Sequence, residues 1–350
     1  MSYQLRLLKI LFFLAAVHSH TVQANPAEEA DETDDLSTAK PPHQPLAAFY
    51  QKKSPFSLRH DPTRKRSIFF PQLVSYFLPG FDQVWERQYD SALIYAATGT
   101  VGLVYANYRA QQLGAANLRT QNNNAYGSKD NYYRGYTLGN EIYQVAGGLS
   151  TYHSFRSAVR SRQNSGDFAF LKEEESLSEI MISPFRVDYL ARPTTWIPLS
   201  IGVLLAYLQN TPSALAQSDM RSTPLKSSDY FYSAASGYEA GVSEESVFRG
   251  WLLPAARYGM DSELLANLTQ ATVFGLAHLG TVKVPIIQAV FGYYLGYLTI
   301  HNNWTISEGV FIHSWWDFIS FLATYSSQDK NSPQKIKQPK FLLLPLEWHF

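Results

Sequence analysis

Three short motifs in the last third of this 350-residue chain together contain carboxylates, histidines and an arginine. A glutamate and a histidine that share one water molecule can form a general base, and a second histidine can stabilise a developing oxyanion. The same side chains could instead hold a divalent metal ion. Either arrangement can hydrolyse an amide bond. The motifs are Glu244-Glu245 with Arg249, Phe274 with His278, and His313 with Asp317.

The first motif contains two adjacent glutamates with different expected roles. Glu245 and Arg249 are four residues apart, so on a helix they share a face in the better orientation for an ion pair. Glu244 points about 100° away around the helix, which leaves it free for catalysis. A structural alternative stays open, because Ser243 could cap a helix whose first turn favours both acids.

The two histidine motifs have structural alternatives as well. A lone histidine on an apolar helix, such as His278, is more often a satisfied core residue than a catalyst. His313 and Asp317 lie one helical turn apart and could simply hydrogen-bond to each other. The three motifs nevertheless follow one another at intervals that each suit one helix plus a turn. Three neighbouring helices could therefore direct these groups into a single polar cavity.

Long uncharged stretches predict the elements that carry these motifs. A stretch of about 20 apolar residues is long enough to cross a bilayer as a helix. An ionisable group at the centre of such a helix costs about 2.5–3.5 kcal/mol, so each one there suggests a function. The alternative is a soluble helical protein with buried core helices. We predict an all-α fold, a polytopic transmembrane helical bundle, built mainly on residues 91–108, 193–218, 264–282, 284–307 and 311–325.

Composition excludes several classes of protein. Lys+Arg and Asp+Glu both total 29, so the formal net charge is zero and no general nucleic-acid partner is expected. The chain has no cysteine, which excludes disulfides, a thiol nucleophile, cysteine-ligated zinc and iron–sulfur clusters. No His-Glu-x-x-His motif occurs either, so a zincin-type site is not expected.

The N-terminal region predicts export and a division into five parts. Positive residues, a short apolar run and a small-x-small pattern ending at Ala24 are typical of a signal peptide. The following polar and then basic stretch predicts a disordered linker. The expected parts are a signal peptide (1–24), a linker (25–66), N-terminal membrane-associated helices of unknown role (67–190), a protease-like core (191–326) and a C-terminal tail (327–350).

The three motifs, in this order and each in an apolar helix, resemble the signature of the CPBP family. These are the CAAX prenyl protease and bacteriocin-processing, or Abi-type, intramembrane proteases. The resemblance covers roughly residues 193–325 and implies an all-α membrane core. It implies that Glu244 with His278 activates water, and that His313 with the residue at Asp317 stabilises the oxyanion. It also implies that Glu245 and Arg249 give structural support, alongside the motif residue Phe274.

The resemblance leaves two features of the mechanism open. Prenyl-protease members carry asparagine at the position of Asp317, and an ionised aspartate cannot donate to an oxyanion. The favoured role of Asp317 is therefore to orient His313 through a direct hydrogen bond. The family mechanism is described both as metal-dependent and as glutamate-type. The cofactor stays unknown; a divalent metal such as zinc, if present, would be held by Glu244, His278 and His313.

The predicted function is that of an intramembrane endopeptidase that cleaves a membrane-associated peptide or protein. Its expected surroundings are membrane lipid, in a multi-pass arrangement in a bacterial inner membrane. Two alternatives remain. One is a non-catalytic membrane scaffold or immunity-type protein that keeps the fold. The other is a small transporter or proton relay that uses the same histidines and acids.

Overall fold

The computed structural model describes residues 65–119, 126–162, 165–210, 224–279 and 285–326. All the helices and strands assigned within these ranges are helices, with no strand among them, which confirms the all-α class. The predicted signal peptide, almost all of the predicted linker and the predicted C-terminal tail lie outside the described residues.

The chain up to residue 210 supplies two short helices and two very long ones, followed by a group of short helical elements and an 18-residue helix. The short helices are α2 (Phe70–Phe77) and α3 (Phe81–Trp85), and the long ones are α4 (Tyr89–Arg119) and α5 (Tyr126–Arg160). After α5 come α6 (Leu177–Ile182), η4 (Ser183–Phe185), η5 (Val187–Ala191) and α7 (Pro193–Asn210).

The second half begins with one continuous helical rod whose winding changes along its length. It consists of α8 (Ser227–Glu239), the π-helical turn η6 (Ala240–Glu244), α9 (Glu245–Val247), a second π-helical turn η7 (Phe248–Leu252) and α10 (Leu253–Met260). The helices α11 (Glu263–Ala277), α12 (Ile286–His301) and α13 (Ser307–Ser326) follow.

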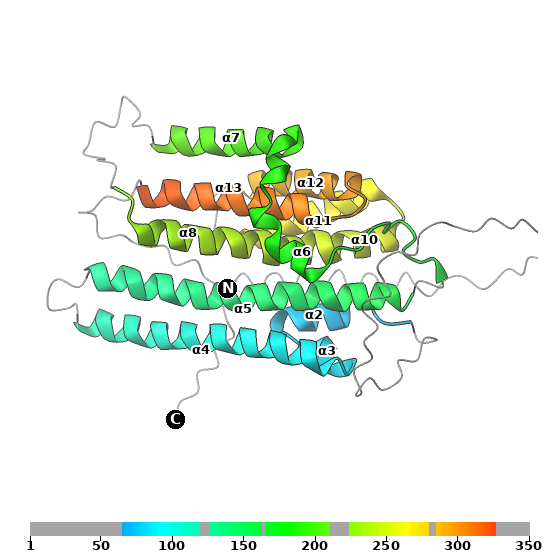
Figure 1. Ribbon diagram of the computed structural model, residues 1–350, viewed down its shortest axis with the longest axis horizontal. Coiled ribbons are helices and arrows are strands. Elements are labelled where there is room, and N and C mark those ends of the chain that lie inside the picture. The colour runs from blue at the N-terminus through cyan, green and yellow to red at the C-terminus, as the bar shows by residue number, and fades with distance from the viewer. Residues whose placement is uncertain (1–64, 120–125, 163–164, 211–223, 280–284, 327–350) are drawn as a thin grey trace, which may run out of the picture.

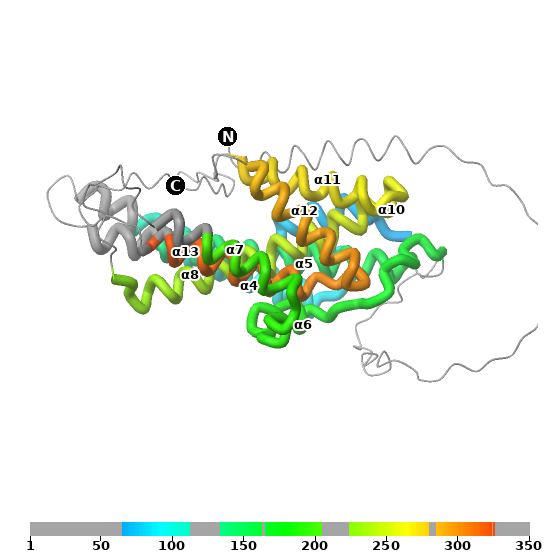
Figure 2. The backbone as a smooth tube through the Cα atoms, turned by 90° about the horizontal axis from the view of Figure 1, so that it is seen from above, coloured from blue at the N-terminus to red at the C-terminus, as the bar shows by residue number. Residues whose placement is uncertain are grey.

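The long helices form a layered stack. In Figure 1, α7, α13, α8, α5 and α4 run side by side in that order, and each contacts the next. Figure 2 shows α11 and α12 as a pair beside α10, at the other end of the rod that begins with α8. The first π-helical turn, η6, contacts both α5 and α13. The segment that carries the two adjacent glutamates is therefore enclosed between these helices.

Buried polar contacts fix the start of α13. The Glu175 carboxylate accepts hydrogen bonds from the backbone N–H groups of Ile306, at 2.5 Å, and Ser307, at 3.0 Å. A carboxylate in this place satisfies N–H groups that lack a partner within the helix. Burial raises the pKa of Glu175, and these hydrogen bonds offset the rise only in part.

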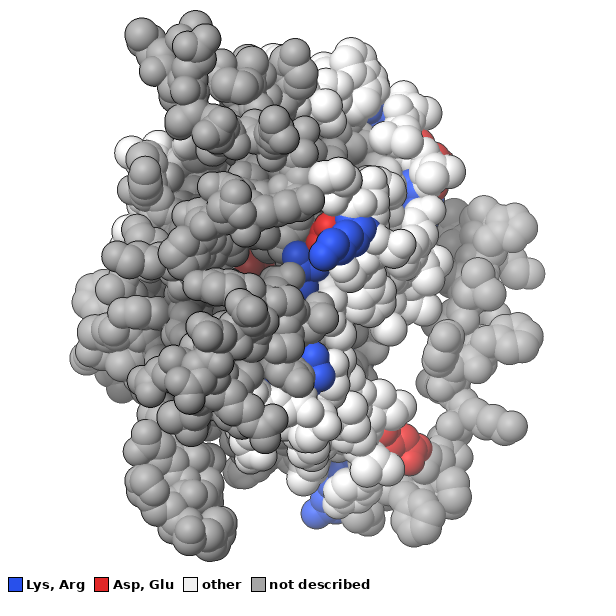
Figure 3. Space-filling model, turned by 90° about the vertical axis from the view of Figure 1, so that its left-hand side faces the viewer, with Lys and Arg blue, Asp and Glu red and all other residues white. Residues whose placement is uncertain are grey.

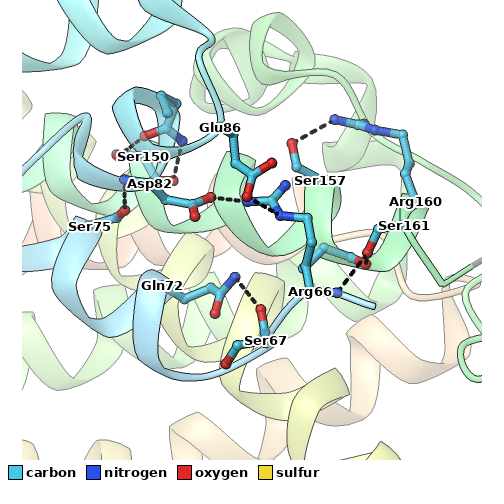
Figure 4. Close-up of polar contacts among 12 residues, drawn as sticks. Arg66, Ser67, Gln72, Ser75, Asp82, Glu86, Ser150, Ser157, Arg160 and Ser161 are labelled. Carbon is cyan, nitrogen blue, oxygen red and sulfur yellow. Dashed lines mark hydrogen bonds and ion pairs between the residues drawn. The ribbon is translucent and has the colours of Figure 1, made fainter. Parts of the chain in front are cut away.

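The segment before α2 is fastened to the bundle by an arginine network. The Arg66 guanidinium donates to Asp82 at 2.5 Å and to Glu86 at 3.0 Å, and Figure 4 shows it lying between these two carboxylates. The indole N–H of Trp251 donates to the carbonyl oxygen of Ile68 at 2.8 Å. The N-terminal region thereby reaches η7 and packs against the rod that carries the first motif.

None of the helices in the described ranges is both long enough and apolar enough to cross a membrane. The expected multi-pass arrangement therefore finds no support in those helices. The face of the bundle seen in Figure 3 presents mostly uncharged side chains where it is described, with acidic and basic residues in small separate groups.

Candidate active site

Glu244 and Glu245 lie where the helical rod changes its winding. Glu244 is the last residue of the π-helical turn η6, and Glu245 opens α9. π-Helical turns within α-helices are frequent at functional sites. Ser243 lies inside the rod, and its hydroxyl donates to the carbonyl oxygen of Gln144 at 2.8 Å. Ser243 is therefore not an N-cap, and the structural alternative for the two acids does not hold.

Glu245 links three helices through one buried carboxylate. The side chain is fully buried, and its Oε1 atom lies 2.7 Å from Nη1 of Arg249 and 2.7 Å from Nδ1 of His313. Arg249 also donates from Nη2 to the carbonyl oxygen of Gly292 in α12, at 3.0 Å. Glu245 thus pairs with Arg249, as their spacing suggests, and in addition holds His313 of α13.

The hydrogen bond to Glu245 fixes the tautomer of His313. A carboxylate only accepts, so Nδ1 of His313 carries a proton and Nε2 faces the other way. The ring is almost entirely buried. A hydrogen-bond partner that orients a histidine in this way is a common feature of catalytic and metal sites.

His278 follows directly after the last residue of α11. Its Nδ1 atom lies 2.8 Å from the carbonyl oxygen of Phe274, one turn earlier. Because a carbonyl oxygen only accepts, Nδ1 carries the proton, and Nε2 is the basic nitrogen of the neutral ring. The side chain keeps 20% of its exposure. His278 is therefore not a residue of the closed core.

Glu244 faces both histidines. Its Oε2 atom lies 3.9 Å from Nε2 of His278 and 3.9 Å from Nε2 of His313. This oxygen is buried and has no hydrogen-bond partner among the described residues. A separation of 3.9 Å is too long for a direct hydrogen bond, but it leaves room for one atom about 2.8 Å from both members of either pair. A water molecule in that position would have at least two polar partners, as a buried water needs.

Asp317 is close to His313 but does not form the direct hydrogen bond expected from their spacing. Its Oδ2 atom lies 3.9 Å from Nε2 of His313, and the other ring nitrogen is held by Glu245. Orientation of His313 therefore comes from a residue 68 positions away rather than from one turn away. The Asp317 side chain keeps 30% of its exposure and lies on the side of His313 that faces Glu244.

Phe274 packs among the charged groups. Its ring centroid lies 4.4 Å from the guanidinium carbon of Arg249, and the ring contacts both His278 and His313. An aromatic face over a guanidinium is a favourable cation–π contact. Phe274 is buried and separates the Arg249–Glu245 pair from solvent. This position suits the supporting role implied by the motif.

A metal centre on Glu244, His278 and His313 is not supported by the arrangement of these donors. Among the described residues, no group of three or more His, Asp or Glu side chains is placed to hold a metal ion. We therefore derive no chemical step through a metal.

Two further buried acids lie beside the site, and the sequence gives no signal for either. Glu239 is the last residue of α8, and Glu141 comes from the middle of α5. Both are more than nine-tenths buried, and each has one carboxylate oxygen without a hydrogen-bond partner among the described residues. Neither belongs to a motif, and only the packing of α5 against the rod brings Glu141 near it.

The comparisons with known proteins agree with the motifs. Residues 227–319 match the family described as type II CAAX prenyl endopeptidase, Rce1-like. Comparisons with curated proteins and with solved structures find no match. The matched segment begins at α8, contains all three motifs and ends within α13. This match to the Rce1-like family over residues 227–319 confirms the resemblance to the CPBP family that the motifs indicated.

Proposed function

We propose that this protein is a membrane-associated endopeptidase in which Glu244, together with His278, activates a water molecule. One observation carries the proposal: the unpartnered Oε2 atom of Glu244 lies 3.9 Å from the Nε2 atoms of two histidines. This group lies inside a segment that matches an endopeptidase family. An unpaired buried carboxylate is costly unless a bound water satisfies it.

The proposed reaction assigns each proton to a named group. Glu244 takes one proton from the water as its oxygen attacks the peptide carbonyl, and Nε2 of neutral His278 accepts a hydrogen bond from the same water. The C–N bond then breaks, and Glu244 passes the proton to the leaving amine. The products are an amine and a carboxylic acid, which keeps the second proton of the water. The acid then loses that proton to the amine or to solvent, and Glu244 returns to its starting charge.

His313 is proposed to stabilise the negative charge that develops on the carbonyl oxygen. When protonated, its ring donates from Nε2, and the Glu245 carboxylate on Nδ1 supports the positive charge. The Asp317 carboxylate, 3.9 Å from Nε2, also favours the positive charge on the His313 ring. Asp317 is therefore proposed as a residue that tunes His313 rather than as an oxyanion donor.

The membrane location is proposed from apolar side chains on the outside of the bundle. Large apolar side chains exposed in this number suggest contact with lipid or with another protein. Zero formal net charge gives no reason to expect a nucleic-acid partner. The exposed residues include Leu93, Ile94, Val101 and Val104 of α4, Trp196, Ile197, Ile201 and Leu204 of α7, and Leu264, Leu268, Ile286, Ile287 and Val290 of α11 and α12.

Comparative proteomics of membrane fractions tests the function even while the substrate is unidentified. Cells that make the wild type, Glu244→Gln or His278→Ala would be compared for new peptide termini. Glu263→Gln is the matched control, because it removes an exposed acid at the start of α11. Termini that appear with the wild type and the control but with neither site variant support the proposal. Termini that are the same in all four strains contradict it.

A further inference from the structure

Two buried amide side chains of α11, Asn267 and Gln270, take no part in the proposed reaction. Both are almost completely buried. The Nε2 atom of Gln270 donates to the carbonyl oxygen of Gly292 in α12 at 2.9 Å, and to Oδ1 of Asn267 at 2.7 Å. Asn267 in turn donates from Nδ2 to the carbonyl oxygen of Tyr293 at 3.0 Å. Asn267 and Gln270 thus form an amide clamp between α11 and α12.

The partners of the amide clamp fix the direction in which each amide group faces. A backbone carbonyl oxygen only accepts, so Asn267 and Gln270 must each direct an N–H group at α12. Both protons of the Gln270 amide are then used, one on Gly292 and one on Asn267. Such directed bonds in a buried place favour one placement of α11 against α12, because other placements leave buried donors unpaired.

A shared carbonyl oxygen connects the amide clamp to the proposed catalytic groups. The carbonyl oxygen of Gly292 also accepts from Nη2 of Arg249, at 3.0 Å. Arg249 is paired with Glu245, and the same carboxylate oxygen holds His313. An unbroken series of hydrogen bonds therefore runs from α13 through the helical rod and α12 to α11. It joins all three elements that carry the motifs, with α12 as the bridge.

The amide clamp and His278 lie on one side of α11. The spacing of three and then four residues places side chains along a single helix face, and it is followed by Asn267, Gln270, Phe274 and His278. The ring of His278 is bound to the carbonyl oxygen of Phe274, within the same helix. Its position opposite Glu244 therefore depends on where α11 as a whole lies. Gln270 precedes His278 by eight residues, or about 12 Å of helix.

The absence of a side chain at Gly296 makes room for the amide clamp. A Cβ atom there would lie 2.0 Å from Oδ1 of Asn267 and 2.5 Å from Nε2 of Gln270. Gly292 is restricted in a similar way, because its Cβ atom would lie 2.9 Å from the ring of Phe274. Over this turn, α12 presents backbone rather than side chains to α11, and the clamp binds to that backbone.

We propose that Asn267 and Gln270 are positioning residues that set the place of α11 and thereby hold His278 beside Glu244, at a separation that one shared water can bridge. This inference rests on the proposed function. Apolar packing between α11 and α12 is not directional, so it restricts sliding and rotation of α11 less than the clamp does. A shift of about 1 Å in a catalytic group can cost about 10²-fold in rate.

Substitutions on both helices test the amide clamp. Gln270→Met keeps the length of the side chain and removes both N–H donors. Gly296→Ala displaces the two amide groups from the side of α12, while alanine itself favours the helix. In each variant, kcat of the folded fraction should fall about 10–10²-fold, with KM changed by less than about twofold.

Thr272→Val is the matched control for these variants. It removes a side-chain hydrogen bond of α11, the one to the carbonyl oxygen of Leu268 at 2.8 Å, but on the exposed face and within one helix. Its kcat and KM should match the wild type. Wild-type kcat in both Gln270→Met and Gly296→Ala would overturn the proposal. A raised KM with unchanged kcat would also overturn it, because it would mean that the clamp affects substrate binding instead.

A distance measurement gives a result even if the protein cleaves no peptide. The chain has no cysteine, so Leu265→Cys in α11 and Phe231→Cys in α8 supply two unique labelling sites on exposed side chains. The distance distribution between spin labels, measured by electron paramagnetic resonance in detergent, should broaden or shift with Gln270→Met and Gly296→Ala but not with Thr272→Val. That change without peptidase activity in any sample would contradict the proposed function alone. An unchanged distribution in both variants would contradict the positioning role.

Discussion

Glu245 shares one buried carboxylate oxygen between a guanidinium and an imidazole. Both contacts are 2.7 Å long, and neither Glu245 nor Arg249 has measurable side-chain exposure. Charge-assisted hydrogen bonds of this kind are strong because no water competes with them. Because both charges are shielded from water, removing one of them leaves the other buried without a counter-ion. Glu245 therefore supports the fold and also orients His313.

Replacing Glu245 should destabilise the protein. Glu245→Gln leaves Arg249 as a buried charge without its counter-ion, and a loss of about 3–5 kcal/mol is typical when one partner of such a pair is removed. The expected result is less folded protein and an earlier unfolding transition in detergent, measured by thermal melting. A Glu245→Gln variant with wild-type melting and yield would show that the pair is not needed for folding.

A double substitution provides the control for this prediction. Glu245→Leu with Arg249→Met removes both charges, which often restores stability at buried pairs. His313 still loses its Nδ1 partner, so peptidase activity should stay absent even in the fraction that folds. Activity in the double variant would mean that His313 needs no orientation by Glu245.

Asp317 provides the second prediction at this scale. Asp317→Asn should keep activity within about tenfold of the wild type, because a residue that tunes His313 contributes about as much as one hydrogen bond. The amide also restores the donor that prenyl-protease members of the family carry. Peptidase rate would be measured with and without a chelator, and no chelator effect is expected. A variant that is inactive until zinc is added would contradict this account and favour a metallopeptidase.

The π-helical turn η6 depends on close contact between the helical rod and α13. A Cβ atom at Gly241 would lie only 2.6 Å from the carbonyl oxygen of Val310 and would overlap the hydroxyl of Ser314. Gly241 lies within η6, between Glu239 and Glu244. The absence of a side chain there lets α13 approach the rod and brings His313 close to the glutamates.

Gly241→Ala should therefore separate these helices. Overpacking of a tight contact costs about 1–3 kcal/mol, and backbone atoms at Val310 cannot move aside as a side chain can. We expect a lower melting temperature and reduced kcat in the folded fraction. Adding Ser314→Ala should restore only part of the loss, since the contact with the carbonyl oxygen remains. Wild-type melting and kcat in Gly241→Ala would show that the close approach is not required.

The changes in helical winding explain what the sequence could and could not predict about the site. Regular helical spacing was enough to predict that Glu245 lies beside Arg249. It could not predict the π-helical turn between Glu239 and Glu244, which alters the angle between residues on either side of it. It also placed His313 against Asp317, whereas the closer partner, Glu245, comes from another helix. Contacts between helices depend on packing, which one-turn spacing does not contain.

At the scale of the whole molecule, the sequence predicted the all-α fold class correctly. The described helices do not support the predicted multi-pass membrane arrangement. Two of the predicted apolar stretches lie entirely within described helices: 91–108 lies within α4, and 311–325, which contains Asp317, lies within α13. Within the described part of the stretch 264–282, α11 ends at Ala277, just before His278. An uncharged run shows where a helix can form, but it does not fix where the helix ends.

The exposed apolar faces lead to a prediction about where the protein is found. Side chains such as Leu93, Ile201 and Ile287 are about half exposed or more, and burying them in lipid would be strongly favourable. We expect the full chain to stay in the membrane pellet after washing with alkaline carbonate and to require detergent for extraction. Full release into the supernatant by carbonate would contradict a lipid-embedded bundle.

The central claim is that Glu244 activates the water that hydrolyses the peptide bond. The most direct test is the single-turnover cleavage rate of purified wild-type protein and Glu244→Gln, with a peptide identified by the membrane proteomics. Glutamine keeps the shape of the side chain but is a far weaker base, so the rate should fall by at least about 10²–10⁴-fold while the melting temperature is unchanged. A Glu244→Gln variant that cleaves the peptide at the wild-type rate would contradict the account.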